Sequence, residues 1–152
     1  MKTLVWAVVT YGCESWTIKI RNEERIEAFE LKCIRTILRV SWTQKKTNGW
    51  VLEAAGVERD LLNLIEWRKL SYFGHMMRKE GDCLEKQIME GTVPGVRKQG
   101  RPKMRWIDEM EKMEKWAMRY KMSFEGLLRE TEDRRRWRRL VHEATNPRNE
   151  DG

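Results

Sequence analysis

The sequence predicts an all-α protein of about six helices, for two reasons. Apolar residues recur at steps of three and four along most of the 152 residues, which is the spacing of one helix face. Alternation of apolar and polar residues, which marks a half-buried strand, is not sustained anywhere. Only the Val-rich run from Leu4 to Thr10 is ambiguous, because it suits a strand or a buried helix equally well.

Two helices are predicted in the first 55 residues. One follows Asn22, the expected N-cap, because acids occupy the next two positions. Its inward stripe is predicted to be Ile26, Phe29, Cys33, Ile34, Ile37 and Leu38. A short second helix is predicted from Thr47 to Ala55, with Thr47 as its cap and Gly56 as the left-handed residue that ends it.

A longer helix is predicted from about Arg59 to Lys79, with Gly81 as its stop. Gly74 in its middle costs helix stability, and the usual reason for such a glycine is the close approach of another helix. Residues 81–102 are rich in Gly and Pro, which predicts a basic connector with a short turn around residues 84–89. We therefore expect two loosely joined helical lobes, residues 1–80 and 103–152, on either side of the connector 81–102.

The second lobe is expected to contain three helices. Pro102 lies near the start of the first, which runs through Trp106 to Tyr120. Ser123 is the expected cap of a short helix, and Thr131 that of the last one. The last helix is predicted to bury Trp137, Leu140, Val141 and Ala144. Its solvent face is predicted to carry Arg135, Arg138, Arg139 and His142.

Positive charge is concentrated in the last third of the chain. The net charge is +7, and residues 97–152 hold 16 Lys and Arg against 11 Asp and Glu. Five cations and no acid lie from Arg97 to Arg105, and five arginines lie within residues 134–139. Such clusters favour a polyanionic partner, so RNA or DNA is expected to bind through its phosphates. The predicted phosphate contacts are Arg97, Lys98, Arg101, Lys103, Arg105, Arg135, Arg138 and Arg139.

Two alternatives for these clusters remain open. The run before Arg105 could be a solvated basic linker. The arginines of the last helix could instead pair along the chain with Glu132, Asp133 and Glu143.

The tryptophans fall into two groups. Trp67, Trp106 and Trp137 lie at core spacing, which predicts burial. Trp42 and Trp50 lie beside Lys45 and Lys46 in or next to a loop, so they are better placed to stack on bases.

Catalytic, metal and cofactor roles are not expected. No acids are placed to hold paired metal ions, and those at 108–114 are spaced for surface ion pairs. His75 and His142 have no recognisable catalytic partner and are expected to be structural, with a phosphate contact as the alternative for His142. The three cysteines show neither disulfide nor zinc spacing, and no apolar run reaches the ~20 residues of a membrane span. An intracellular protein, nuclear or cytoplasmic, is expected.

Several segments together resemble the C-terminal part of non-long-terminal-repeat (LINE-type) retrotransposon reverse transcriptases. No single segment is specific, but their order extends over almost the whole chain. The first set is Tyr11-Gly12-Cys13-Glu14-Ser15-Trp16, residues 27–40, Trp42-Thr43 and Thr47-Asn48. The second set is Trp67-Arg68-Lys69-Leu70, Phe73-Gly74-His75, Gly100-Arg101-Pro102, Arg105-Trp106-Ile107-Asp108, Asp133-Arg134, Trp137-Arg138 and Leu140-Val141.

The resemblance implies a thumb followed by a helical extension that holds template RNA or target DNA. The palm with its paired aspartates, the fingers and the endonuclease have no counterpart here, so a non-catalytic fragment is expected. Gly49-Trp50 stands where the family shows two acids. Two other functions remain open: a helical protein-interaction module that meets other parts of a reverse transcriptase, and an inert translated relic. Exposed apolar surface around Leu4, Val5, Trp6, Val8 and Val9 would favour the interaction module, whereas one continuous basic face joining the two arginine clusters would favour nucleic acid.

Overall fold

The computed structural model describes residues 2–81, 83–90 and 124–145, and within these ranges it contains helices and no strand. The predicted all-α class is confirmed. The expected helix from Pro102 to Tyr120 and the cap Ser123 lie outside the described residues. In chain order the elements are the π-helical turn η1 (Lys2–Trp6), α1 (Ala7–Val9), the 3-10 turn η2 (Cys13–Ser15), α2 (Ile20–Ile37), the 3-10 turn η3 (Trp42–Gln44), α3 (Asn48–Ala55), α4 (Leu61–Met77), α5 (Leu84–Glu90), α8 (Phe124–Glu132) and α9 (Arg134–Thr145).

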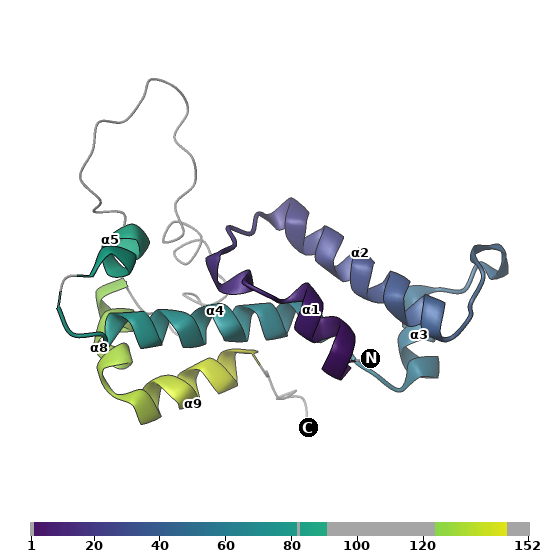
Figure 1. Cartoon of the computed structure of the whole chain (residues 1–152). Helices are drawn as coiled ribbons and strands as arrows, with labels where there is room; N and C mark the ends of the chain where they lie inside the picture. Colours follow the sequence, from purple (N-terminus) through teal and green to yellow (C-terminus); the bar gives the residue numbers. More distant parts are fainter. Residues whose placement is uncertain (1, 82, 91–123, 146–152) are drawn as a thin grey trace, which may run out of the picture.

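Helix α4 lies at the centre of the molecule and takes part in two cores (Figure 1). Its N-terminal half shares the first core with the N-terminal segment, through Trp6, Cys13, Ile18, Leu61 and Ile65. Its C-terminal half packs with α5, α8 and α9 in a second core of Leu70, Phe73, Met76, Met77, Met89, Leu127, Trp137, Leu140 and Val141. Because α4 is covered on several sides, it needs the wide apolar surface that the sequence shows.

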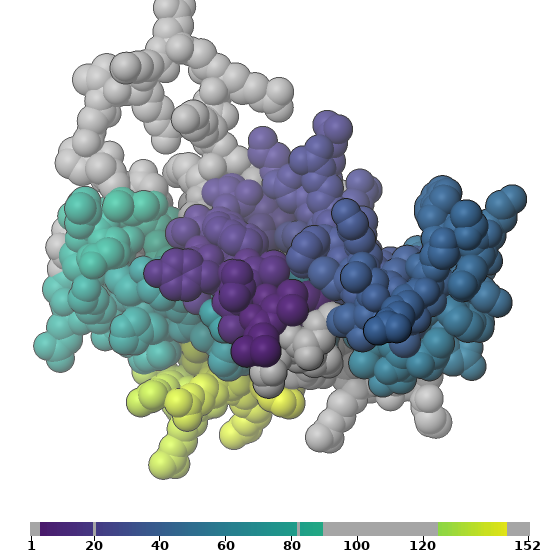
Figure 2. Space-filling model, turned by 45° about the vertical axis from the view of Figure 1, so that its right-hand side comes forward, coloured from purple at the N-terminus to yellow at the C-terminus, as the bar shows by residue number. Residues whose placement is uncertain are grey.

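The second core joins residues from both predicted lobes. Helix α4 belongs to the expected first lobe, and α8 and α9 belong to the expected second. The space-filling view shows α9, in yellow, lying directly below α4 and α5 (Figure 2). Most of the connector lies outside the described residues, so its course and the lobe boundaries stay a prediction.

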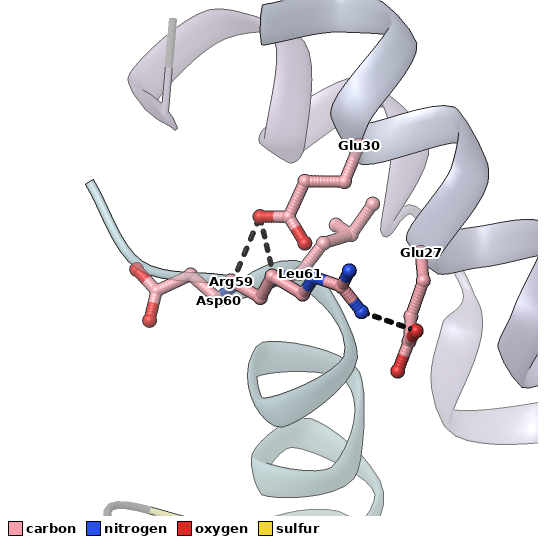
Figure 3. Close-up of polar contacts among 5 residues, drawn as sticks. All are labelled: Glu27, Glu30, Arg59, Asp60 and Leu61. Atoms are coloured by element: carbon pink, nitrogen blue, oxygen red, sulfur yellow. Dashed lines mark hydrogen bonds and ion pairs between the residues drawn. The ribbon is translucent and has the colours of Figure 1, made fainter. Parts of the chain in front are cut away.

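A carboxylate from α2 caps the start of α4 (Figure 3). Asp60, the N-cap residue, makes no capping hydrogen bond through its own side chain. The buried Glu30 instead accepts hydrogen bonds from the backbone N–H groups of Asp60 and Leu61, at 2.9 and 3.2 Å. Glu30 thereby satisfies two donors that a helix start leaves open, and it places an anion at the positive end of the helix dipole. Beside it, exposed Arg59 donates to Glu27 at 2.6 Å.

Gly74 lets α9 approach α4 closely, which confirms the predicted reason for this glycine. A Cβ atom at Gly74 would lie 2.0 Å from Nε1 of Trp137. The indole occupies that space and is 2% exposed. Its Nε1 donates to the backbone oxygen of Leu70 at 3.0 Å, and its ring lies 5.8 Å from that of Phe73, centroid to centroid. The predicted burial of Trp137 is also confirmed.

Helix α3 has the ends that the sequence predicted. The Thr47 hydroxyl accepts a hydrogen bond from the backbone N–H of Trp50 at 3.2 Å, and Gly56 ends the helix with a φ of 60°. Both signals are local, because each depends on one side chain and the turn next to it.

Two other predicted helix ends are wrong. Asn22 does not cap α2, which begins two residues earlier at Ile20. Gly81 does not stop α4, which ends at Met77 with Arg78 as its C-cap. Gly81 takes its positive φ of 79° in the turn that follows.

The ambiguous run at residues 4–10 is helical and forms most of η1 and α1. Leu4 and Val8 on its outer side are each 77% exposed. On α2, Phe29 and Ile37 from the predicted inward stripe are also exposed. That stripe is wider than the surface that α4 and the N-terminal segment cover, so part of the predicted core of α2 is wrong.

Candidate nucleic-acid interface

Helix α9 is amphipathic, as predicted. Its buried side carries Trp137, Leu140 and Val141. Its exposed side carries Arg135, Arg138, Arg139 and His142. At 100° per residue these four side chains fall in one sector of the helix, which therefore presents a continuous basic face.

Asp133, not Thr131, caps α9. Its Oδ1 accepts hydrogen bonds from the backbone N–H groups of Arg135 and Arg136, at 2.7 and 3.2 Å. These two bonds are the main reason why the pKa of Asp133 lies below its ordinary value. Thr131 lies within α8 and its hydroxyl donates to the backbone oxygen of Leu128 at 2.6 Å. The predicted cap is wrong because α8 continues past it.

The arginines of α9 form no ion pair within the described part of the chain, although the pKa of Asp133 is lowered first by its backbone hydrogen bonds and then by the charges of Arg136 and Arg135. The ion pairs found there join Arg59 to Glu27, Arg68 to Glu14 and Lys79 to Glu85. None of them includes an arginine of α9. The alternative of pairing with Glu132, Asp133 and Glu143 therefore has no ion pair to support it within these residues.

Helices α4 and α9 run antiparallel (Figure 1). A groove of about 630 Å³ lies between them, along one flank of the basic face. Helix α4 lines it with Trp67, Ser71, His75 and Arg78, whose spacing of four, four and three residues forms one helical stripe. Helix α9 lines it with Arg134, Trp137, Arg138, Val141 and His142. The described lining thus holds three arginines, two histidines and no acid.

Arg78 lies where the positive charges of the two helices meet. Its Nη1 donates to the backbone oxygen of Thr131 at 2.9 Å, which fixes the guanidinium beside the start of α9. Burial lowers the pKa of Arg78, and the charges of Arg134 and Arg138 lower it further. The guanidinium stays charged at neutral pH, so the groove holds cations that repel one another. An anion with several charges would relieve that repulsion.

The predicted phosphate contacts differ in their position relative to the groove. Arg138 lines the groove, and Arg135 and Arg139 lie on the adjoining outer face of α9. The five predicted contacts from residues 97 to 105 lie outside the described residues, so their union with α9 in one surface stays a prediction. Arg78 and Arg134 also line the groove but were not among the predicted contacts. The sequence shows the spacing that places Arg78 on one face of α4, but only the packing of α4 against α9 makes that face the wall of a groove.

Trp67 is not a core residue, so its predicted burial is wrong. It is 44% exposed and lines both the groove and a second cavity of about 590 Å³ next to η2. Trp42 and Trp50 are exposed as well, which agrees with their expected position in or beside a loop.

The described ranges contain neither a metal cluster nor a membrane-spanning helix. No three His, Cys, Asp or Glu side chains there are grouped to hold a metal ion. No helix of that part combines the length and the apolar character needed to cross a membrane. Cys13, Cys33 and Cys83 are free thiols, and burial raises the pKa of Cys13.

Comparison with known proteins finds a transposon-derived relative. The chain is 30% identical over 115 residues to a transposon-derived protein of Caenorhabditis elegans. The match covers 72% of this chain and 41% of that protein, so the chain spans about two fifths of its relative. The sequence matches no protein-family profile, and no solved structure matches it.

Proposed function

We propose that this chain is a nucleic-acid-binding part of a LINE-type reverse transcriptase, equivalent to the thumb and helical extension. It binds RNA or DNA through phosphate contacts and contributes binding without the polymerase or nuclease step. The groove between α4 and α9 is the observation that supports this function most strongly.

The groove suits a phosphate backbone for two physical reasons. Its described lining holds Arg78, Arg134 and Arg138 without an acid, so its cations are available to an external anion. Guanidinium groups bind phosphate oxygens in paired hydrogen bonds, which makes arginine the preferred side chain for such contacts. The outer face with Arg135 and Arg139 extends the same positive surface around α9.

Two further observations support the retrotransposon origin. The similarity to a transposon-derived protein supports a transposon origin for the chain. The ordered segments that resemble LINE-type reverse transcriptases are the basis for proposing this class of transposon. Since the chain spans about two fifths of its relative, any activity of the longer protein remains outside this proposal.

The test is a salt titration of binding with defined RNA and DNA. We expect a combined Arg135→Gln, Arg138→Gln and Arg139→Gln variant to weaken binding with little regard to base sequence. The slope of log affinity against log salt should flatten by roughly two to three units, because each lost phosphate contact removes ~0.7 to 0.9 of a released counterion. The fold should survive, because these side chains are exposed.

A matched control separates contact from net charge. Lys19, Arg21 and Arg25 are also exposed cations, around the start of α2. Their combined replacement by Gln removes the same charge without touching the groove. If both triple variants change the slope alike, the effect comes from net charge and the assigned interface is wrong. If neither variant changes affinity or slope, the nucleic-acid function is wrong.

The protein-interaction module remains the second candidate because apolar side chains are exposed at the N-terminal segment. Leu4 and Val8 are each 77% exposed, and Tyr11 is 85% exposed. Such a cluster is typical of an interaction surface. Sedimentation tests it. An absence of nucleic-acid binding, together with assembly that Leu4→Ser and Val8→Ser abolish, would establish the interaction module instead.

A further inference from the structure

A second basic surface lies on the side of the molecule away from α5 and α8. Residues 31–52 contain five cations and no acid. They span the end of α2, the α2–α3 loop (residues 38–47) and the start of α3, and the loop projects from the body of the molecule (Figures 1 and 2). No carboxylate of the described residues forms an ion pair with these cations, which are Lys32, Arg35, Arg39, Lys45 and Lys46.

The tip of this loop exposes a large aromatic side chain. Trp42 is 93% exposed in the single-turn helix η3. Leaving such a side chain in water forgoes roughly 2–3 kcal/mol of burial energy. Trp50 at the start of α3 is also exposed, and Nζ of Lys46 lies 4.7 Å from the centroid of its ring. Indole rings and cations therefore lie together on this surface.

The loop is held in one shape by hydrogen bonds. Arg35 of α2 donates to the backbone oxygen of Lys46 and to Oδ1 of Asn48, both at 2.9 Å. The Ser41 hydroxyl caps η3 by accepting from the backbone N–H of Thr43 at 3.3 Å. These bonds hold the backbone on either side of Trp42, while its indole stays open to solvent.

The backbone on both sides of Trp42 is strained. Arg39 and Lys45 have φ values of 53° and 47°, in the left-handed region that non-glycine residues rarely adopt. Each such residue costs on the order of 1 kcal/mol and persists only where surrounding contacts impose it. Strain of this kind is concentrated at binding sites, where it shapes a surface before the ligand arrives.

We propose that the α2–α3 loop is a contact site for single-stranded nucleic acid, in which an unpaired base stacks on Trp42 while Arg39, Lys45 and Lys46 contact phosphates. An exposed indole among unpaired cations is the combination that binds single strands, because every base offers a ring face for stacking. A duplex hides those faces between its own base pairs. The site goes beyond the groove of α4 and α9, because it is on other elements and selects unpaired bases.

The experiment compares three loop variants of the full chain by fluorescence titration. The probes are a 12-nucleotide single strand and a blunt duplex of the same sequence. We expect Trp42→Ala to weaken single-strand binding by roughly 5- to 150-fold, the loss of one stacked base, and to leave duplex binding unchanged. Trp42→Phe should restore part of the affinity, because a smaller ring still stacks. Gln44→Ala is the control, since it alters an exposed neighbour in η3 without removing a ring.

Other outcomes would overturn the site. Equal losses on single strand and duplex, or no loss on either, would show that no base stacks on Trp42. A fluorescence change with anionic lipid vesicles but not with the single strand, lost in Trp42→Ala, would assign the loop to a membrane surface. Helical circular dichroism checks that each variant is folded. The Gln variants of α9 report separately on the groove, so either site can fail without the other.

Discussion

The contact between Gly74 and Trp137 predicts a large effect from a small substitution. In an exposed helix, replacing glycine with alanine stabilises by about 1 kcal/mol. In Gly74→Ala the new methyl group would lie 2.0 Å from Nε1 and 2.3 Å from Cδ1 of Trp137, so the indole or the whole of α9 must move. We therefore expect Gly74→Ala to lower stability, against its helix propensity.

The magnitude follows from three terms. Overpacking of a closed core costs typically about 1–3 kcal/mol. Displacing the indole also weakens its hydrogen bond to Leu70, which contributes about 0.5–1.5 kcal/mol. The gain in helix propensity offsets about 1 kcal/mol of this cost. The expected net loss is about 0.5–3.5 kcal/mol in the free energy of unfolding.

Urea denaturation followed by circular dichroism measures the loss, and Gly49→Ala is the matched control. Gly49 lies in α3 with no atom within 4 Å of an added Cβ, so its replacement should be neutral or stabilising. The Trp137→Leu background tests the cause, because a smaller side chain there leaves room for the methyl group. A Gly74→Ala variant as stable as Gly49→Ala, or one equally damaged in the Trp137→Leu background, would refute the packing argument.

Three further predictions concern stability and also follow from the contacts. Glu30→Ala should lower the free energy of unfolding, measured in urea, by about 1–3 kcal/mol, because two N–H groups at the start of α4 lose their acceptor. Glu27→Ala should cost less than about 1 kcal/mol, because its ion pair with Arg59 is exposed. Similar losses in the two variants would refute the capping role of Glu30. The pKa of Asp133 is lowered in the folded protein, so its contribution to folding stability is present above the unfolded pKa and is lost as pH falls through the folded pKa. Asp133→Asn should keep the cap but make the free energy of unfolding less dependent on pH in the acid range. An unchanged acid dependence would contradict this. Trp137→Ala should cost about 3–5 kcal/mol and Trp67→Ala clearly less, because only Trp137 is fully buried. Equal losses would contradict this difference in burial.

The sequence predicted those features that depend on neighbours along the chain. The ends of α3 were predictable because Thr47 and Gly56 act within one turn of their own position. The inward side of α9 was predictable because its period of three and four residues is strong. Gly74 predicted a close contact, although the sequence does not name Trp137 as the partner.

The features that the sequence missed depend on contacts between distant elements. Helix α4 is capped by Glu30, which lies 30 residues before Asp60, so no local pattern at the helix start reveals it. Trp67 has the spacing of a core residue, but no described element covers its side of α4. The groove likewise forms only where α4 packs against α9, and the lining residues of either helix alone do not predict it.

The charges of the groove oppose stability and thereby support a binding role. Arg78 faces Arg134 and Arg138, and Arg134 to Arg136 lie at the start of α9, where the helix dipole is unfavourable to cations. A chain selected only for stability gains nothing from this arrangement, whereas a ligand with several negative charges converts the repulsion into affinity. Arg138→Gln should therefore raise the melting temperature at low salt and weaken nucleic-acid binding in the same protein. Saturating RNA should raise the melting temperature of the parent chain more than that of the variant. If Arg138→Gln lowers stability and leaves binding unchanged, the residue serves the fold and the groove is not a phosphate site.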